Sequence, residues 1–294
     1  AAVQNAVELA GKTLDKIKIV ASGAGAAALA CLNLLVSLGV KRENVWISDL
    51  EGVVYEGREK LMDQWKSVFA QKTDKRTLNE IIDNADVFLG LSAGGVLKQD
   101  MVKRMAKDPL ILALANPNPE IMPEDARAVR TDAMMCTGRS DYPNQVNNVL
   151  CFPYIFRGAL DVGATQINEA MKHAAVKAIA KLAREAPSDV VARASGGEVS
   201  TFGPNSLIPS PFDPRLILRI APAVARAAIE SGVARRPIED FKAYEERLSG
   251  FVFRSGFIMK PIFEKAKSAP KRVIYADGED ERVLRAAQIA KEEG

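Results

Sequence analysis

The sequence is poor in the residues that most often bind metals or form disulfides. Its 294 residues include one histidine, His173, and three cysteines, Cys31, Cys136 and Cys151. A single histidine excludes a site with several histidine ligands, and the cysteines lack the spacing of a zinc site. We expect His173 to be a partly exposed helix residue, because no metal-binding partner accompanies it. An odd number of cysteines in apolar surroundings indicates a reducing compartment, so we expect the protein in the cytoplasm.

Neither sign of charge dominates the sequence. It has 40 basic and 37 acidic side chains, a formal net charge of +3. The two signs alternate closely, as in EGREK, so the sequence lacks the basic track that binds nucleic acid. With 48% hydrophobic and 26% charged residues, the chain has the composition of a globular protein that buries a core.

One uncharged run is long enough to cross a membrane. Residues 20–40 contain no charged side chain. The run includes Gly23, Gly25 and Gly39 and has no flanking aromatic belt, so a buried strand, a turn and a buried helix explain it better. We therefore expect no membrane partner. The first residues lack a secretory signal and begin within a helical pattern, which suggests a piece of a longer chain.

Strands and helices alternate through the first half of the sequence. We predict strands over residues 17–22, 44–49, 85–92, 109–116 and 132–138. Helices are predicted over residues 2–9, 26–38, 55–70 and 98–106. Such alternation requires crossover connections, and therefore a parallel sheet with helices on both faces. The predicted fold is a Rossmann-like, doubly wound α/β fold.

The second half of the sequence is predicted to be helical. Helices are expected over residues 154–162, 167–185, 214–231 and 238–248, interrupted by a Gly/Ser/Pro-rich loop over 194–214. The apolar stripe of residues 216–229 could form a subunit contact or an intrachain core, and we favour the core. A new strand–turn–helix unit begins near residue 271. We therefore divide the chain into a domain over 1–250, a linker helix over 251–270 and the start of a second domain over 271–294.

A glycine-rich turn, GAGAAA, connects the first strand to the next helix. In this pattern Gly23 permits a tight turn and Gly25 lets the backbone approach a pyrophosphate, while the helix N-terminus attracts phosphate. The next strand ends in Asp49, where an acid that binds a ribose belongs. These features predict a dinucleotide site formed by Gly23, Ala24, Gly25, Ala26, Ala27 and Asp49.

Three later strands also end in small, turn-forming residues, in LSAGGVL, LANPNPEI and CTGRSDYPNQVNN. Ligands of open α/β sheets bind beyond the carboxyl ends of the strands. The amides of Asn116, Asn147 and Asn148 can both donate and accept, which suits a carboxamide or a carboxylate. Asn116 could equally be an ordinary turn residue. Arg139 could bind phosphate or carboxylate, or form a structural salt bridge.

Five segments together resemble the cofactor-binding domain of malic enzymes: GAGAAA, DLEG, LSAGG, ALANPNPEI and PNQVNNVLCFPYIFRGALD. Their order and spacing match over residues 1–250. The tail, KRVIYADGEDERVLRAAQ, resembles the start of a phosphate acetyltransferase domain. This pairing is similar to the hybrid bacterial malic enzymes, and Tyr154, where many stand-alone members have glycine, also fits that group.

The resemblance implies NADP-dependent oxidative decarboxylation of L-malate to pyruvate and CO2, with Mg²⁺ or Mn²⁺ in the intact enzyme. Residues 23–26 would hold the pyrophosphate and Asp49 the adenosine ribose. Ser92, Ala93 and Gly94 would line the dinucleotide. Asn116 would lie by the nicotinamide ribose and the substrate. Asn147 and Asn148 would bind the malate carboxylate.

The family's catalytic acid, base and metal ligands precede this domain, so we expect no catalytic or metal-binding residue here. The chain alone is predicted to be inactive with malate and Mn²⁺. The resemblance also implies a homo-oligomer and acetyl-CoA as a ligand of the second domain. Two alternatives stay open. One is a dinucleotide-sensing module without catalysis; the other is an amino-acid or folate dehydrogenase, which the segments ANPNPE and QVNN disfavour.

The preference between NADP and NAD depends on conflicting signals. Asp49 favours the free 2′-hydroxyl of NAD and would repel a 2′-phosphate. Arg58 and Lys60, on the predicted helix that follows, could compensate, although both are expected to face solvent. Because hybrid members mostly use NADP, the resemblance favours NADP, with NAD as the alternative.

Overall fold

A computed structural model of the protein describes residues 1–185, residues 201–252 and some of the residues between 265 and 288. It divides into two units, residues 1–239 and residues 240–294. The predicted linker helix over 251–270 lies mostly outside the described residues. Residues 271–276 form no strand, and residues 283–284 and 286–288 are helical.

A six-stranded sheet forms the centre of the first unit, in the order β3-β2-β1-β4-β5-β6. The strands are β1 (Ile19–Ser22), β2 (Val45–Asp49), β3 (Gly52–Val53), β4 (Val87–Gly90), β5 (Leu110–Ala113) and β6 (Met134–Thr137). All neighbours pair in parallel except β3, which is antiparallel to β2. The five predicted strands are therefore confirmed, and the short β3 was missed.

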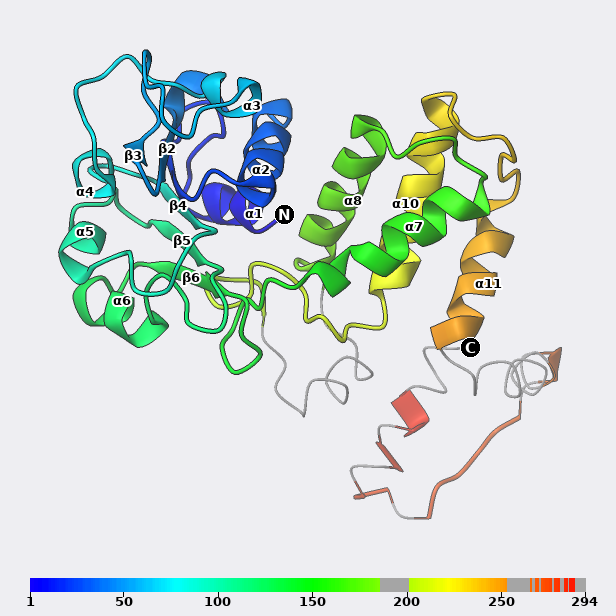
Figure 1. The fold of residues 1–294 in the computed structure, drawn as a ribbon. Helices are drawn as coiled ribbons and strands as arrows, with labels where there is room; N and C mark the ends of the chain where they lie inside the picture. Colours follow the sequence, from blue (N-terminus) through cyan, green and yellow to red (C-terminus); the bar gives the residue numbers. More distant parts are fainter. Residues whose placement is uncertain are drawn as a thin grey trace. The chain divides into compact units, whose positions relative to one another are not determined.

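Helices cover both faces of the sheet, which confirms the doubly wound α/β fold (Figure 1). They are α1 (Ala2–Leu9), α2 (Ala26–Ser37), α3 (Gln64–Ser67), α4 (Leu78–Ile81), α5 (Gln99–Lys103) and α6 (Pro123–Val129), with a 3₁₀ turn, η1 (Arg42–Asn44), before β2. Val20, Phe88 and Ile111 pack in one core with residues of α4, α5 and α6. Burial on both faces explains why the strands read as continuous apolar runs.

The predicted helix over residues 55–70 is wrong except for the single turn α3. Asp63 starts that turn by accepting hydrogen bonds from the backbone N–H groups of Trp65 and Lys66. The residues before it form turns, and Gly57 has a φ of +83°. The Arg58 side chain donates to the carbonyl oxygen of Lys60 in this loop and to those of Gly52 and Val53 in β3, which holds the loop against that strand.

Three longer helices follow the sheet: α7 (Phe152–Asp161), α8 (Glu169–Leu182) and α10 (Leu216–Glu230). The helix α10 packs against both others and buries Leu216, Ile220 and Val224. The approach to α7 is close, because a Cβ on Gly158 would lie 2.4 Å from the Ala221 carbonyl oxygen. The apolar stripe of α10 is thus an intrachain core, as favoured. The second unit contains α11 (Phe241–Val252).

Side chains from α1 and α8 connect the helical part to the sheet part. The buried Asn5 amide donates to the carbonyl oxygens of Ala180 and Leu207, at 3.0 and 2.8 Å. Arg184 donates to the Asn5 oxygen. His173, half-buried on α8, forms a 2.8 Å hydrogen bond with Ser37 of α2. His173 therefore has a structural partner.

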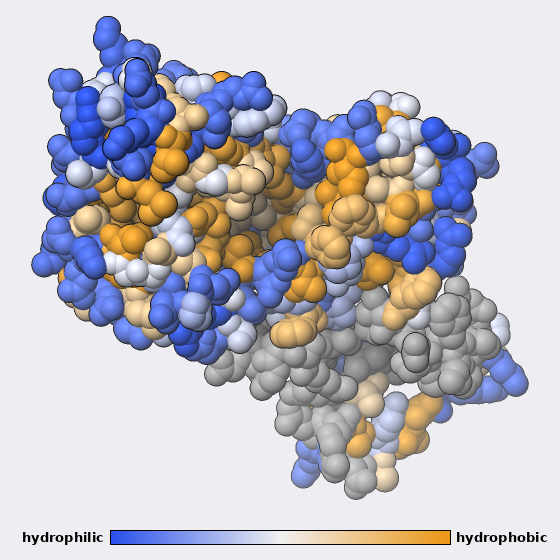
Figure 2. All heavy atoms as spheres, in the orientation of Figure 1, coloured by the Kyte–Doolittle hydropathy of each residue, from blue (hydrophilic) through white to orange (hydrophobic). Residues whose placement is uncertain are grey.

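An apolar stripe remains exposed on α7, where Figure 2 shows hydrophobic side chains at the surface. Phe152, Phe156 and Leu160 are 61%, 44% and 67% exposed, and the two phenylalanine rings contact each other edge-to-face.

In the part of the chain that the structure describes, no helix has the length and apolar character of a membrane span. Residues 20–40 form β1, the turn and α2, as preferred from the sequence.

Candidate functional site

The turns after β1 and β4 lie side by side at the carboxyl edge of the sheet. The Leu91 N–H donates to the Ser22 carbonyl oxygen at 2.9 Å, and the Ser22 and Ser92 hydroxyls are 2.8 Å apart. The chain runs from β1 to one neighbour, β2, and later to the other, β4. This is the switch point of a doubly wound sheet, where ligands of such folds bind.

The glycine turn between β1 and α2 contains two glycines in different environments. Gly23 has a φ of +106°, and a Cβ there would lie 2.4 Å from the Leu91 carbonyl oxygen, so the turn requires glycine. Gly25 is the N-cap of α2, has a φ of −80° and is exposed. None of the described side chains caps this helix start. Its N–H groups, beside the exposed Ala26 and Ala27, can therefore receive an anion.

Asp49, predicted to bind a ribose, is held by two cations. Arg58 donates to both of its carboxylate oxygens, at 2.8 and 2.6 Å, and Lys66 donates to Oδ2 at 2.8 Å. The Glu51 N–H also donates to Oδ1, at 3.0 Å. Burial raises the pKa of Asp49, but the hydrogen bonds from Arg58 and Lys66 outweigh that effect and leave it below its ordinary value.

The expectation that Arg58 faces solvent is wrong, because its side chain is only 3% exposed. Lys60 does face solvent, with its side chain 81% exposed, 3.8 Å from Glu51. The sequence analysis missed Lys66, whose side chain is 9% exposed. Its role depends on how the loop between β3 and α3 folds back, and no local pattern in the sequence signals that path. One carboxylate against two cations leaves this cluster with a net positive charge.

The turn after β4 and the segment after β5 form one layer. The Gly95 N–H donates to the Pro119 carbonyl oxygen at 3.1 Å, and a Cβ on Gly94 would lie 2.8 Å from the Asn118 carbonyl oxygen. Ser92, Ala93, Gly94 and Asn116 are exposed on it. The structure thus brings together the predicted cofactor residues that follow these two strands.

The carboxylate of Glu120 lies beneath this layer. Glu120 is fully buried, and its two oxygens accept the N–H groups of Ser92 and Ala115, each at 3.0 Å. The sequence analysis did not single it out. An acid that follows a proline turn in NPNPEI reads as an ordinary loop residue, and only the tertiary structure reveals its burial.

The loop after β6, which contains Asn147 and Asn148, lies at the same edge of the sheet as Asn116, which follows β5. A Cβ on Gly138, directly after β6, would lie 3.4 Å from Asn116 Oδ1. The Val146 N–H donates to the Thr137 carbonyl oxygen at 2.7 Å, which holds the loop at the strand end. Asn147 caps the 3₁₀ turn η2 (Asn148–Leu150) by accepting the Val149 N–H, whereas Asn148 is exposed.

Two further residues of this loop have structural partners. The buried Asn144, which the sequence analysis missed, has a φ of +55°, donates to the carbonyls of Met135 and Pro204 and accepts the Leu207 N–H. It therefore anchors the loop to the segment that follows residue 200. Arg139 pairs with Asp141, at 2.9 and 2.6 Å, which is the salt-bridge alternative weighed from the sequence.

Within the described ranges, no three His, Cys, Asp or Glu side chains are placed to hold a metal ion. The described residues thus do not fit the divalent metal that the resemblance implies. Burial raises the pKa of Cys31 and Cys151, and that of Cys136 to about 12, which disfavours the thiolate form of each.

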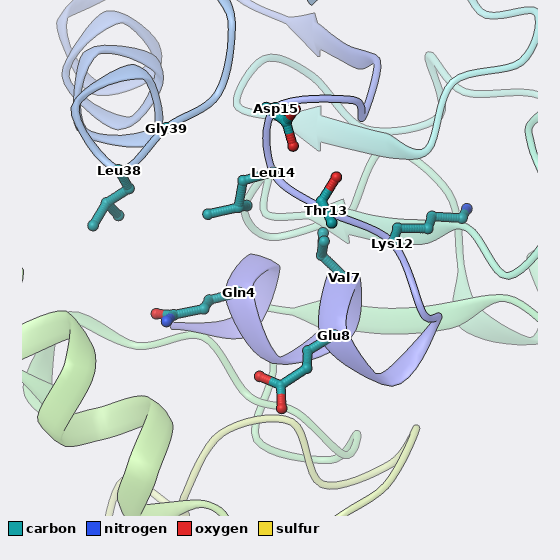
Figure 3. A pocket seen from close by; sticks show the side chains of 9 residues that line it. All are labelled: Gln4, Val7, Glu8, Lys12, Thr13, Leu14, Asp15, Leu38 and Gly39. Atoms are coloured by element: carbon teal, nitrogen blue, oxygen red, sulfur yellow. The ribbon is translucent and has the colours of Figure 1, made fainter.

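A separate hollow of about 420 Å³ lies at the opposite, amino edge of the sheet (Figure 3). It is lined by α1, by residues 12–15 and by Leu38 and Gly39 at the end of α2. Its three charged side chains already have partners, since Glu8 pairs with Arg184, Lys12 with Asp86, and Asp15 forms a hydrogen bond with Thr13. The carboxyl edge, with its exposed turns, is therefore the candidate site.

A mostly parallel sheet in this order, a glycine turn that opens a helix and exposed small residues at the switch point define a dinucleotide-binding domain of the Rossmann-like class. Comparison with known families makes the assignment specific. Residues 1–191 match the family described as "Malic enzyme, NAD binding domain", and the chain belongs to the malic enzyme family. Residues 257–294 match a second family, "Phosphate acetyl/butaryl transferase".

Relatives and solved structures agree with this assignment. The chain is 72% identical to an NAD-dependent malic enzyme of Rhizobium meliloti over 100% of its length, and 61% identical to an NADP-dependent malic enzyme of Haemophilus influenzae over 98%. It spans 38% of the length of each. The crystal structure of a malic enzyme from Pyrococcus horikoshii superposes with a TM-score of 0.74 at 34% identity, covering 91% of this chain and 60% of that one.

Proposed function

We propose that this chain forms the NADP-binding part of an enzyme that converts L-malate to pyruvate and CO2 by oxidative decarboxylation. The observation that carries the proposal is the glycine turn at the switch point, whose residues 25–27 are exposed. The Gly23 N–H donates to the Ser48 carbonyl oxygen at 2.8 Å, directly before Asp49, which pairs with Arg58 and Lys66. Family membership and the names of the relatives support the reaction. The malate reaction is proposed for the whole protein, of which this chain supplies one part.

The chain's own residues bind and orient in this proposal. The N–H groups at the start of α2 receive the pyrophosphate, and Ser92, Ala93 and Gly94 line the dinucleotide. Asn116 lies by the nicotinamide ribose and the substrate, and Asn148, with Asn147 beside it, receives the malate carboxylate. The bound nicotinamide supplies the hydride acceptor. The acid, the base and the Mg²⁺ or Mn²⁺ ligands belong to other parts of the enzyme.

The charge of the Asp49 cluster supports NADP over NAD. A free Asp49 carboxylate would repel a 2′-phosphate, but here two cations offset its charge. Arg58 pairs with both Asp49 oxygens, so Lys66, whose Nζ lies 2.8 Å from Oδ2, supplies the positive charge in excess beside the carboxylate. The 72% identical relative is named NAD-dependent and the 61% identical one NADP-dependent, so the names alone do not decide between the cofactors.

Calorimetric titration of the intact protein with NADP⁺ and with NAD⁺ tests this choice. In Lys66→Gln we expect the NADP⁺ dissociation constant to rise about tenfold, the effect of losing one charge-assisted hydrogen bond, and that of NAD⁺ to change less. Lys12→Gln is the matched control, since Lys12 pairs with Asp86 at the opposite edge of the sheet, and should alter neither constant. Equal changes for both cofactors in Lys66→Gln would contradict a 2′-phosphate contact.

Activity measurements separate the enzyme from a dinucleotide-sensing module. With L-malate, NADP⁺ and Mn²⁺ we expect NADPH formation by the intact protein and none by this chain alone, because the acid and base are outside it. Dinucleotide binding by an intact protein that oxidises no malate would favour the sensor. Rapid turnover by a pure preparation of this chain would contradict the absence of catalytic residues.

The remaining proposals concern the whole protein. We propose the domain division 1–250, 251–270 and 271–294, with acetyl-CoA as a ligand of the second domain, supported by the family match over 257–294. A homo-oligomer is also proposed, and the exposed apolar stripe of α7 is a surface compatible with it. The cytoplasm remains the proposed compartment, supported by three free cysteines.

A further inference from the structure

We propose that Glu120 is a positioning residue that sets the spacing between the two cofactor-binding loops, after β4 and after β5. This inference rests on the proposed dinucleotide function. Glu120 is fully buried, and each of its carboxylate oxygens serves one loop: Oε1 accepts the Ser92 N–H and Oε2 the Ala115 N–H, both at 3.0 Å. A carboxylate is suited to this task because it only accepts hydrogen bonds, at both oxygens.

The surrounding backbone leaves room for this carboxylate. A Cβ on Gly90, the last residue of β4, would lie 2.4 Å from the Glu120 carboxyl carbon and within 2.7 Å of both oxygens. The carboxylate therefore packs directly over the end of β4, where only glycine permits it. The Glu120 carbonyl oxygen also accepts the Leu97 N–H at 3.0 Å, so backbone and side chain both join the same two segments.

Both ends of this link reach predicted cofactor residues. Ser92, held by one oxygen, contacts Ser22 through their hydroxyls, and Ser22 directly precedes Gly23 of the pyrophosphate turn. Ala115, held by the other oxygen, directly precedes Asn116, which is proposed to lie by the nicotinamide ribose. One buried carboxylate thus sets the distance between the pyrophosphate end and the nicotinamide end of the site. Correct spacing affects dinucleotide affinity and also the orientation of the reacting ring.

The test compares Glu120→Gln with Asp132→Asn in the intact protein. Asp132 also accepts a backbone N–H, from Asp108 at 2.8 Å, but it lies before β6, at the opposite edge of the sheet. The amide oxygen of a glutamine at position 120 can accept only one of the two N–H groups. Its NH₂ group then faces the other N–H, so that two donors oppose each other. We expect Glu120→Gln to raise the NADP⁺ dissociation constant about tenfold and to lower kcat, while Asp132→Asn changes neither by more than about twofold.

The outcomes separate a failure of the Glu120 inference from a failure of the proposed function. A folded Glu120→Gln protein with unchanged NADP⁺ affinity and kcat would overturn this inference and leave the proposed function standing. Wild-type protein that binds neither NADP⁺ nor NAD⁺ would overturn the proposed function, and the inference with it. If Glu120→Gln does not fold, amide hydrogen exchange of the wild type decides, because the Ser92 and Ala115 amides should exchange slowly although they lie outside the strands. Fast exchange of both would overturn the link.

Discussion

Gly23 and Gly25 belong to one turn, but the atoms around them differ. At Gly23 the backbone has a positive φ and a Cβ would collide with the Leu91 carbonyl. At Gly25 the backbone is extended, and a Cβ would meet no described atom within 4 Å. Gly23 is therefore needed for the fold, whereas Gly25 leaves space for a ligand.

Alanine substitutions separate these two roles. We expect Gly23→Ala to lower the free energy of unfolding by about 2 kcal/mol or more, from backbone strain and overlap. Gly25→Ala should leave stability within about 0.5 kcal/mol of wild type and weaken NADP⁺ binding about tenfold, since its methyl group would stand where the pyrophosphate approaches. Urea unfolding and calorimetric titration measure the two quantities. Normal NADP⁺ affinity in Gly25→Ala would contradict the predicted contact.

At the scale of elements, one buried amide joins segments that are far apart in the sequence. Asn5 of α1 bonds to the last turn of α8 and to Leu207, and Arg184 completes its hydrogen bonds. These contacts attach the helical part of the first unit to the sheet part. The position of the helices beside the site therefore depends on a polar side chain inside an otherwise apolar contact.

Removing this amide should weaken the attachment strongly. We expect Asn5→Ala to lower the free energy of unfolding by about 2–4 kcal/mol, because two buried carbonyls lose their donor and the Arg184 guanidinium loses one of its two acceptor side chains. Glu8→Gln, which weakens the exposed pair with Arg184, should cost less than about 1 kcal/mol. Urea unfolding of both variants tests the difference. Equal effects would mean that the Asn5 bonds add little to the surface ion pair.

At the scale of the whole molecule, the acid dependence of stability includes a contribution from Asp132. Hydrogen bonds from the Arg130 guanidinium, opposed by burial and aided by the Asp108 N–H, hold the pKa of Asp132 below its usual range. A lowered pKa means that the ionised carboxylate is stabilised in the folded protein. Its contribution is present above the unfolded pKa and is lost as the pH falls through the folded one.

The difference in unfolding free energy between wild type and Asp132→Asn isolates this contribution, since the other carboxylates are common to both proteins. We expect this free-energy difference to have its full size at neutral pH. It should begin to shrink once the pH falls below about 3.9, the ordinary pKa of an aspartate carboxyl. Urea unfolding at a series of pH values measures it. A difference that grows as the pH falls would show that the sign of the pKa shift is wrong.

The sequence by itself determined the five parallel strands, the doubly wound fold and the glycine turn. These follow from local patterns: apolar runs for buried strands, and small residues at the entry to a helix. The helix predicted over 55–70 failed because Arg58 binds the carbonyl oxygens of β3 and the Asp49 carboxylate, contacts that helical periodicity does not encode. The same local patterns also left the roles of the site's charged residues undecided.

Only the tertiary structure decided which charges are paired and which are buried. Lys66 reaches Asp49 across 17 residues, and Glu120 reaches Ser92 across 28. Both contacts depend on the path of a loop and on the register of neighbouring strands, so no short segment contains them. Electrostatic partners change with distance and burial in three dimensions, and for that reason the sequence could name Asp49 and offer Arg58 as a compensating cation, but not the burial of Arg58 or the contact of Lys66.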